Sequence, residues 1–286
     1  MATANMKDVK RRIKSVESTR QITKAMELVA SSKLRRAKDR AEASQPFFNT
    51  LYETMCDISN DRTLKSFFTA KQFRRTNLLV VIAGDRGLAG GFNHNVLKLA
   101  KARAAELEAS GNKVKIMAIG KKSLEFFEKR GYNIVKSYSQ IFDNVPSEIL
   151  DEISSFIISQ MKMNEIGSVE LIYTTFVSTL AQEPLHVKVL PIDTLTNQAG
   201  AKSLTIYEPS AESVFESLIP LYLKGIFHGA IVDSYASELA ARRNAMESAS
   251  DNADDMIDRL SLLYNRARQA QITQELTEIV SGSMRK

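Results

Sequence analysis

Residues 230–281 read AIVDSYASELAARRNAMESASDNADDMIDRLSLLYNRARQAQITQELTEIVS and contain neither glycine nor proline. Nothing local stops a helix before Gly282, and at 1.5 Å per residue that helix would be roughly 75–80 Å long. Small and apolar residues recur along it in alternating steps of three and four, a heptad pattern that requires a partner helix. The predicted contact positions are Met246, Ala249, Ala253, Met256, Leu260, Leu263, Ala267, Ala270, Gln274 and Thr277.

A second heptad pattern in the first sixty residues offers that partner. One extra four-residue step after Ala30 predicts a local phase shift, and Pro46 should kink or end the helix because it cannot donate a backbone hydrogen bond. The simplest arrangement is a long antiparallel coiled coil of the two chain ends. Its first helix is predicted to make contact through Val16, Thr19, Thr23, Met26, Ala30, Leu34, Ala37, Ala41, Ser44, Phe48, Leu51, Met55 and Ile58.

The register of this coiled coil follows from the helical rise. If the chain turns near residues 60 and 210, the numbers of paired residues should sum to about 270. Met26 would then lie near Asn244, and the first residues of the chain would lie near Asn265. Beyond Asn265 the last helix is predicted to project alone. Pro220, Gly225 and Gly229 predict an irregular start to this helix.

The middle of the chain predicts a small α/β domain. Short apolar runs at 78–83, 114–119, 134–138, 169–177 and 185–190 read as strands, and helical patterns alternate with them. This order is typical of a mainly parallel, Rossmann-like sheet. The predicted division is a coiled-coil helix at 1–60, the α/β domain at 61–208 and a second coiled-coil helix at 209–286.

Composition and charge narrow the class of protein. The hydrophobic fraction is 44%, yet no apolar run reaches the roughly 18–20 residues that a membrane span needs. The polar, basic opening predicts neither a secretory signal nor a transit peptide. The net charge of +6 is concentrated between Lys7 and Arg40. Such a strip suits nucleic acid, an anionic surface, an acidic protein partner or a solvated helix face.

A glycine-rich turn, GDRGLAGGFN at 84–93, follows the first predicted strand. Its spacing matches neither a dinucleotide fingerprint nor a P-loop, and Asp85 would oppose a phosphate, so we interpret it as a structural turn. Three histidines, His94, His186 and His228, lack the spacing of metal ligands. We therefore expect no metal, no cofactor and no catalytic residue. The acidic cluster of Asp251, Asp254, Asp255 and Asp258 reads as a solvated face.

Three segments together resemble one family. They are MKDVKRRIKSVESTRQITKAMELVASSKLRRA at 6–37, the turn at 84–93, and NRARQAQITQELTEIVSG at 265–282. The chain resembles the gamma subunit of the rotary F-type ATP synthase, of the bacterial type, from end to end. Ala89 stands where the family commonly has cysteine, and Arg243 where methionine is more usual. A cysteine-bearing insertion of the chloroplast kind is missing, so the resemblance implies no thiol control.

The resemblance implies a non-catalytic rotor. The helix pair would be the axle inside a ring of alpha and beta subunits, and the α/β domain would stand on the membrane-embedded c ring beside the epsilon subunit. Ion flow would then be coupled to catalysis on beta, at the cytoplasmic face of a bacterial membrane. Family positions in contact with beta or in coupling match Met26, Arg242, Arg268, Gln269, Thr273 and Glu275, and those at the c ring and epsilon match Tyr207 and Glu208.

Two other classes of protein stay open on the sequence. A nucleotide-binding α/β protein with helical arms would bind nucleotide saturably on its own. A basic coiled-coil scaffold would bind DNA or RNA in a salt-dependent way.

Overall fold

The computed structural model describes residues 6–59, 66–69, 74–192, 207–208 and 210–283. The chain forms two compact units. One comprises residues 32–241, and the other comprises residues 1–31 and 242–286. The predicted domain boundaries, at 60–61 and at 208–209, fall on or beside residues outside the described ranges.

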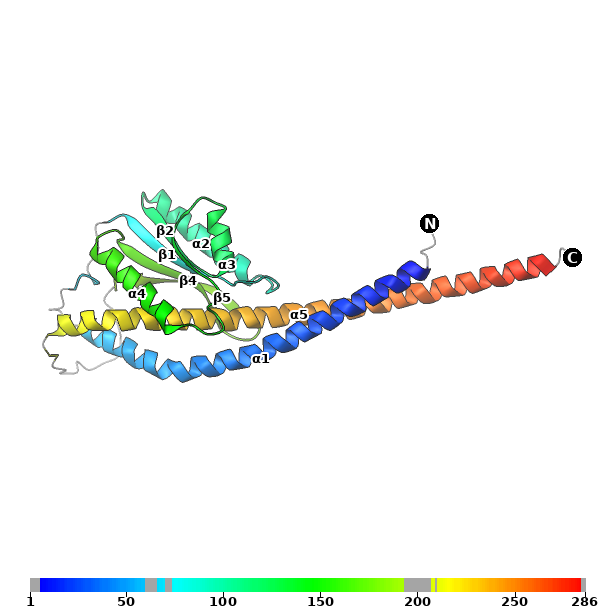
Figure 1. The fold of residues 1–286 in the computed structure, drawn as a ribbon, viewed down its shortest axis with the longest axis horizontal. Coiled ribbons are helices and arrows are strands. Elements are labelled where there is room, and N and C mark those ends of the chain that lie inside the picture. Colours follow the sequence, from blue (N-terminus) through cyan, green and yellow to red (C-terminus); the bar gives the residue numbers. More distant parts are fainter. Residues whose placement is uncertain (1–5, 60–65, 70–73, 193–206, 209, 284–286) are drawn as a thin grey trace. The chain divides into compact units, whose positions relative to one another are not determined.

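The larger unit is built on a five-stranded sheet, shown in Figure 1. Its strands are β1 (Thr76–Ile82), β2 (Lys113–Ile119), β3 (Asn133–Tyr138), β4 (Ser168–Phe176) and β5 (Gln182–Leu190). Their order across the sheet is β3-β2-β1-β4-β5, and only the β4–β5 pair is antiparallel. All five strands were predicted from their apolar runs, and the mainly parallel pairing is confirmed.

Apolar side chains cover both faces of this sheet, because successive residues of a strand point to opposite sides. Leu79 and Val81 face the layer that holds α2 (Phe92–Ala109) and α3 (Lys121–Glu128). Leu78 and Val80 face α4 (Ser147–Lys162) together with parts of the two longest helices. Those helices are α1 (Met6–Ser59) and α5 (Ala211–Ser283). The predicted terminal helices are thus part of the core.

Within the larger unit, α1 and α5 meet through small side chains. Leu34 and Ala37 of α1 form one buried cluster with Ala236, Leu239 and Ala240 of α5. Alanine at these positions lets the two backbones approach closely, as expected for a tight antiparallel pair. The side chains of the predicted contacts Ala41, Ser44 and Phe48 lie outside the described residues.

Within the smaller unit, polar contacts fix the register of the same two helices. The Thr23 and Ser250 hydroxyls are 2.7 Å apart and buried, and Arg20 donates to Asp254 at 2.9 Å. The residue numbers of these pairs sum to 273 and 274. The antiparallel arrangement is therefore confirmed, with a register three to four residues from the predicted one.

The predicted contact face of the helix pair was partly wrong. Thr19 is exposed, and Met256 and Leu263 are 51% and 48% exposed. The contact line of α5 instead includes Ser250, which is buried, and Ile257 and Tyr264, which are half-buried. The pattern was ambiguous because a seam of small polar residues such as Ser250 carries no apolar signal, whereas Met256 and Leu263 do.

The predicted irregular start of α5 was wrong, and α1 does not end at Pro46. α1 continues through Pro46, and α5 runs unbroken from Ala211 through Pro220 to a point past Gly282. A proline removes only one helical hydrogen bond, and burial of neighbouring apolar residues on α5 offsets that loss. In α1 the predicted contact residues on both sides of the extra four-residue step, Thr23, Ala30, Leu34 and Ala37, are all buried.

Gly120 provides a test of how tightly β1 and β2 meet at the glycine-rich turn. Its φ is +92°, and a Cβ there would lie 1.7 Å from the Ala83 carbonyl oxygen. Gly120→Ala should therefore lower the free energy of unfolding by about 3 kcal/mol or more, measured by thermal unfolding followed by circular dichroism.

Two glycines supply controls for this substitution. Gly131 also has a positive φ of +72° but open space around its Cβ position, so Gly131→Ala should cost about 1 kcal/mol. Gly87 has neither restriction, and Gly87→Ala should be neutral to within about 0.5 kcal/mol. Equal losses for Gly120→Ala and Gly131→Ala would contradict the steric explanation.

Candidate functional site

The glycine-rich turn makes hydrogen bonds to other parts of the chain, both as an acceptor and as a donor. The Asp85 carboxylate accepts the N–H of Lys121, at the start of α3, and the N–H of Gln140, each at 2.9 Å. The Gly84 N–H donates to the Asn93 side chain at 2.8 Å. Leu88 and Gly90 have positive φ. The positive φ angles fit the predicted structural turn, and Asp85 accepts backbone N–H groups that a phosphate could otherwise use.

The position where doubly wound sheets bind ligands is occupied by α5. In such sheets the ligand crevice lies outside the carboxyl ends of the strands where the order reverses, here β1 and β4. At the end of β4, the Ser234 hydroxyl accepts the Thr174 N–H at 3.2 Å. Ser237 donates to the Thr174 carbonyl oxygen at 3.3 Å. The chain thus fills its own crevice with a helix.

Two acidic side chains of α5 would repel a phosphate group at this position. Glu238 is only 4% exposed, and its carboxylate carbon lies 2.9 Å from the position that a Cβ on Gly84 would take. Asp233 accepts a hydrogen bond from Thr175 at 3.1 Å, and burial raises the pKa of its carboxyl group. The buried Glu238 and the half-buried Asp233 thus place acidic groups at the ends of both strands, where they oppose an anionic ligand.

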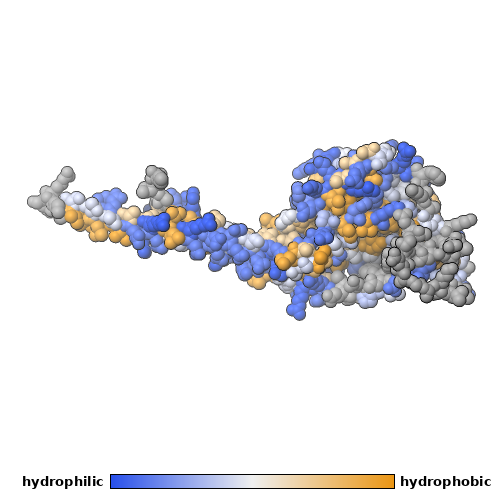
Figure 2. Space-filling view, turned by 180° about the vertical axis from the view of Figure 1, so that it is seen from behind, coloured by the Kyte–Doolittle hydropathy of each residue, from blue (hydrophilic) through white to orange (hydrophobic). Residues whose placement is uncertain are grey.

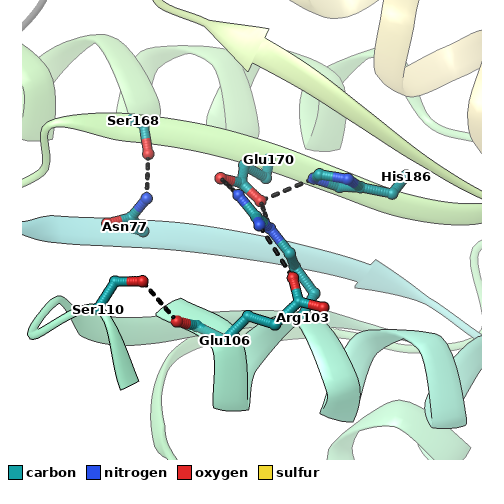
Figure 3. Close-up of polar contacts among 7 residues, drawn as sticks. All are labelled: Asn77, Arg103, Glu106, Ser110, Ser168, Glu170 and His186. Atoms are coloured by element: carbon teal, nitrogen blue, oxygen red, sulfur yellow. Dashed lines mark hydrogen bonds and ion pairs between the residues drawn. The ribbon is translucent and has the colours of Figure 1, made fainter. Parts of the chain in front are cut away.

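A buried charged cluster lies on the opposite side of the sheet, between α2, β4 and β5 (Figure 3). Arg103 of α2 donates two hydrogen bonds to Glu170 of β4, at 2.7 and 2.9 Å, and Glu170 is 4% exposed. His186 of β5 lies 2.7 Å from the same carboxylate. Figure 3 also shows Asn77 donating to Ser168, between β1 and β4, at 2.6 Å.

The electrostatics of this cluster indicate a structural role. Burial is the largest single influence and would raise the pKa of Glu170, but the hydrogen bonds and charges of Arg103 and His186 together lower it below its ordinary value of 4.5. The carboxylate therefore stays ionised and paired, and it joins α2 to the last two strands. Sequence reasoning missed this contact, since it depends on the pairing of β4 with β5.

The described residues contain no group of histidine, cysteine or acidic side chains arranged to hold a metal ion. Among them there is also no helix long and apolar enough to cross a membrane.

The sequence-predicted contact residues near the C-terminus share one property. Every residue from Arg268 to Ser281 is exposed, including Gln269, Thr273 and Glu275. Figure 1 shows the red end of α5 continuing past the start of α1, as predicted from the register. Side chains here make hydrogen bonds within the helix: Thr273 donates to the Gln269 carbonyl at 2.9 Å, and Gln271 donates to Glu275 at 3.0 Å.

The other predicted residues lie in different places. Met26 and Arg242 are half-buried in the helix pair of the smaller unit. Tyr207 and Glu208 precede α5, where Tyr207 packs against the core of the larger unit and Glu208 is exposed. Arg242 and Arg268 are far apart along the same helix, so these two residues do not share one site.

Exposed apolar side chains on the smaller unit are the feature that sequence reasoning missed. Figure 2 shows them as orange patches between hydrophilic ones along the helix pair. A fully solvated helix pair would not gain from such exposure, so these residues indicate a partner surface. They are Ile22, Leu28 and Val29 of α1 and Met256, Leu262, Leu263, Ile272, Leu276, Ile279 and Val280 of α5.

Comparison with known proteins accounts for this arrangement. Residues 5–284 match the family model described as ATP synthase. The ATP synthase gamma chain of Ruminococcus albus is 59% identical over 283 residues, covering 98% of each chain, and that of Alkaliphilus metalliredigens is 45% identical over 286 residues, covering 97% of each. The chain belongs to the ATP synthase gamma-chain family.

Solved central-stalk structures share the fold of this gamma-chain family member. A chain of the Tetrahymena thermophila mitochondrial ATP synthase central stalk and c ring matches with a TM-score of 0.60 at 25% identity, over 80% of this chain and 99% of that one. A chain of the Euglena gracilis mitochondrial ATP synthase matches with a TM-score of 0.68 at 18% identity, over 98% and 93%. The chain is therefore a central-stalk subunit of this family.

The Glu170 cluster yields a stability prediction with a defined pH dependence. Glu170→Gln removes the charge that Arg103 requires and should cost about 2 kcal/mol of unfolding free energy at pH 7. Because the folded pKa of Glu170 is lowered, its contribution is complete above the ordinary value of 4.5 and is lost as the pH falls below it. Thermal unfolding of both chains between pH 7 and pH 3 measures this.

Glu106 is the matched control, since it also pairs with Arg103 but its side chain is 65% exposed. Glu106→Gln should change stability by less than about 0.5 kcal/mol. If the difference in unfolding free energy between the wild type and Glu170→Gln stayed constant down to pH 3, the charge of Glu170 would not be the cause of that difference.

Proposed function

We propose that this chain turns inside a ring of alpha and beta subunits and carries rotation from a c ring to catalytic sites on beta. The observation that carries this proposal is the exposed end of α5, residues 268–281, with apolar side chains along its length. A single helix of this length is marginal in water, so a surrounding sleeve of protein would stabilise it. The family membership supports alpha and beta subunits as that sleeve.

The proposed mechanism depends on asymmetry. Two helices of unequal length present a different surface at each rotational angle, and each of the beta subunits meets a different face in turn. A rotor can shift the balance between open and closed states only through contacts that differ between them. Dispersed and modest contacts suit this task, because one tightly bound angle would stop rotation. Catalysis belongs to beta, and this chain contributes no catalytic residue.

Particular residues carry these contacts in the proposal. Arg268, Gln269, Thr273 and Glu275 touch the loops of beta near the tip of α5. Their exposure supports this, because nothing in the described chain occupies their outward face. Met26 and Arg242 belong to the coupling contact on the helix pair. The basic strip on α1 faces acidic residues of beta.

The foot of the rotor is proposed to be the α/β domain. Tyr207 and Glu208, which precede α5, face the c ring and the epsilon subunit. Tyr207 packs against the core, which holds the neighbouring Glu208 at the surface, where its side chain is exposed. The assembly is proposed to lie at the cytoplasmic face of a bacterial cell membrane and to transport hydrogen or sodium ions.

The nucleotide-binding alternative is disfavoured by the occupied crevice at β1 and β4. A basic scaffold for nucleic acid is disfavoured by the apolar side chains interspersed along the same helix pair, which phosphate groups would not cover. Binding of the chain to DNA or RNA that falls steeply with salt would favour the scaffold.

Reconstitution tests the proposed function directly. Co-purification with alpha and beta subunits should give a stable complex, and a bead on the chain should rotate when ATP is hydrolysed. A complex whose ATPase activity is the same with and without this chain would contradict the proposal.

Two substitutions test the assigned contacts. Arg242→Glu and Gln269→Leu should each slow ATP turnover or uncouple it from ion transport. Loss of a polar contact that contributes about 1–2 kcal/mol would lower the rate of ATP turnover by about five- to thirtyfold. Lys129→Glu is the control, because Lys129 is an exposed charge of the α/β domain outside these contacts. Unchanged coupling in both variants would refute the assigned contacts while leaving the family role intact.

A further inference from the structure

The loop between β3 and α4, residues 139–146, is held firmly on the α/β domain. Its Gln140 N–H donates to Asp85 of the glycine-rich turn. The next two side chains, Ile141 and Phe142, are 4% and 7% exposed and belong to the core. The backbone at the next residue, Asp143, is therefore held in place by these buried side chains.

Asp143 reaches both long helices of the larger unit at once. Lys33 of α1 donates to one carboxylate oxygen at 2.6 Å, and the Tyr235 hydroxyl of α5 donates to the other. Arg40 of α1 donates to the Asp143 carbonyl oxygen at 2.5 Å. Hydrogen bonds from Lys33 and then Tyr235 lower the pKa of Asp143, so it remains ionised near neutral pH.

The neighbouring side chains make this contact directional. Lys33 and Arg40 are seven residues apart, so they lie on the same face of α1. Phe142 stacks on the Tyr235 ring, with ring centres 6.3 Å apart and planes inclined by 27°. The helix-to-helix contacts beside them are mostly alanine, which allows close approach but carries few features that stop one helix from turning against the other.

We propose that Asp143 is a positioning residue that fixes the rotational setting of α1 and α5 against the α/β domain, so that torque applied to the domain reaches both helices. The side chain of Asp143 is 67% exposed, and an ion pair this exposed adds little to global stability. Its consequence is mechanical. This inference rests on the proposed function, in which the α/β domain receives the rotation.

The test measures torsional stiffness in the assembled enzyme. A bead is attached through Glu108→Cys, an exposed residue of α2, in a chain whose native cysteine is replaced by serine. With the catalytic ring immobilised and the rotor stalled by a non-hydrolysable ATP analogue, the angular fluctuation of the bead is recorded. Asp143→Asn should broaden the angular variance by less than about twofold, because twofold is the limit if one of two helices carried no load and buried residues such as Met55 still join α1 to the core.

Two further variants make the result specific. Tyr235→Phe keeps the ring stacking and removes only the hydroxyl, and it should broaden the variance less than Asp143→Asn. Glu152→Gln is the matched control, because Glu152 pairs with Lys136 inside the α/β domain at similar exposure, and it should leave the variance unchanged. An Asp143→Asn variance equal to that of the wild type overturns the proposal. A wild-type bead that never rotates with ATP instead overturns the proposed function.

Discussion

Close contact between α1 and α5 is the constraint on which the rest of the structure depends. Ala37, Ala236 and Ala240 allow the two backbones to approach, and the Thr23–Ser250 hydroxyl contact satisfies polar groups where apolar ones are absent. Neither helix is hydrophobic enough to be stable alone at such length. Pairing supplies rigidity, and it leaves each helix an outward face for other proteins. The exposed methionine, leucine and isoleucine side chains lie on those outward faces.

The α/β domain has the strand order of a ligand-binding sheet, but α5 lies at the position where such sheets bind ligands. Ser234, Ser237 and Glu238 meet the ends of β1 and β4, and Asp85 holds the backbone donors of the turn. The same contacts that displace a ligand attach the domain to the helix pair. The α/β domain therefore serves to hold the helix pair, and the glycine-rich turn contributes to that attachment.

Much of this fold could be predicted from the sequence, because its main signals are local. The apolar runs gave all five strands, and the absence of helix breakers between residues 230 and 281 gave the long helix. The face of α5 that contacts α1 could not be predicted from the sequence, because Ser250 contributes through a hydrogen bond and gives no apolar signal. Asp143 and Glu170 act through residues far away in sequence, so their partners emerge only from the tertiary structure. The contact residues at the tip depended on the family resemblance, because an exposed helix looks the same whether or not a partner surrounds it.

The most direct test of this account is a cross-link between the two ends of the chain. Thr23→Cys and Ser250→Cys, combined in a chain without its native cysteine, should form an intramolecular disulfide rapidly under mild oxidation, whereas Thr19→Cys with Ser250→Cys should not. The assembled enzyme should still rotate with the first pair oxidised, because both helices turn together. Failure of the first pair to cross-link, or loss of rotation once it does, would contradict a rotor made of two helices that move as one.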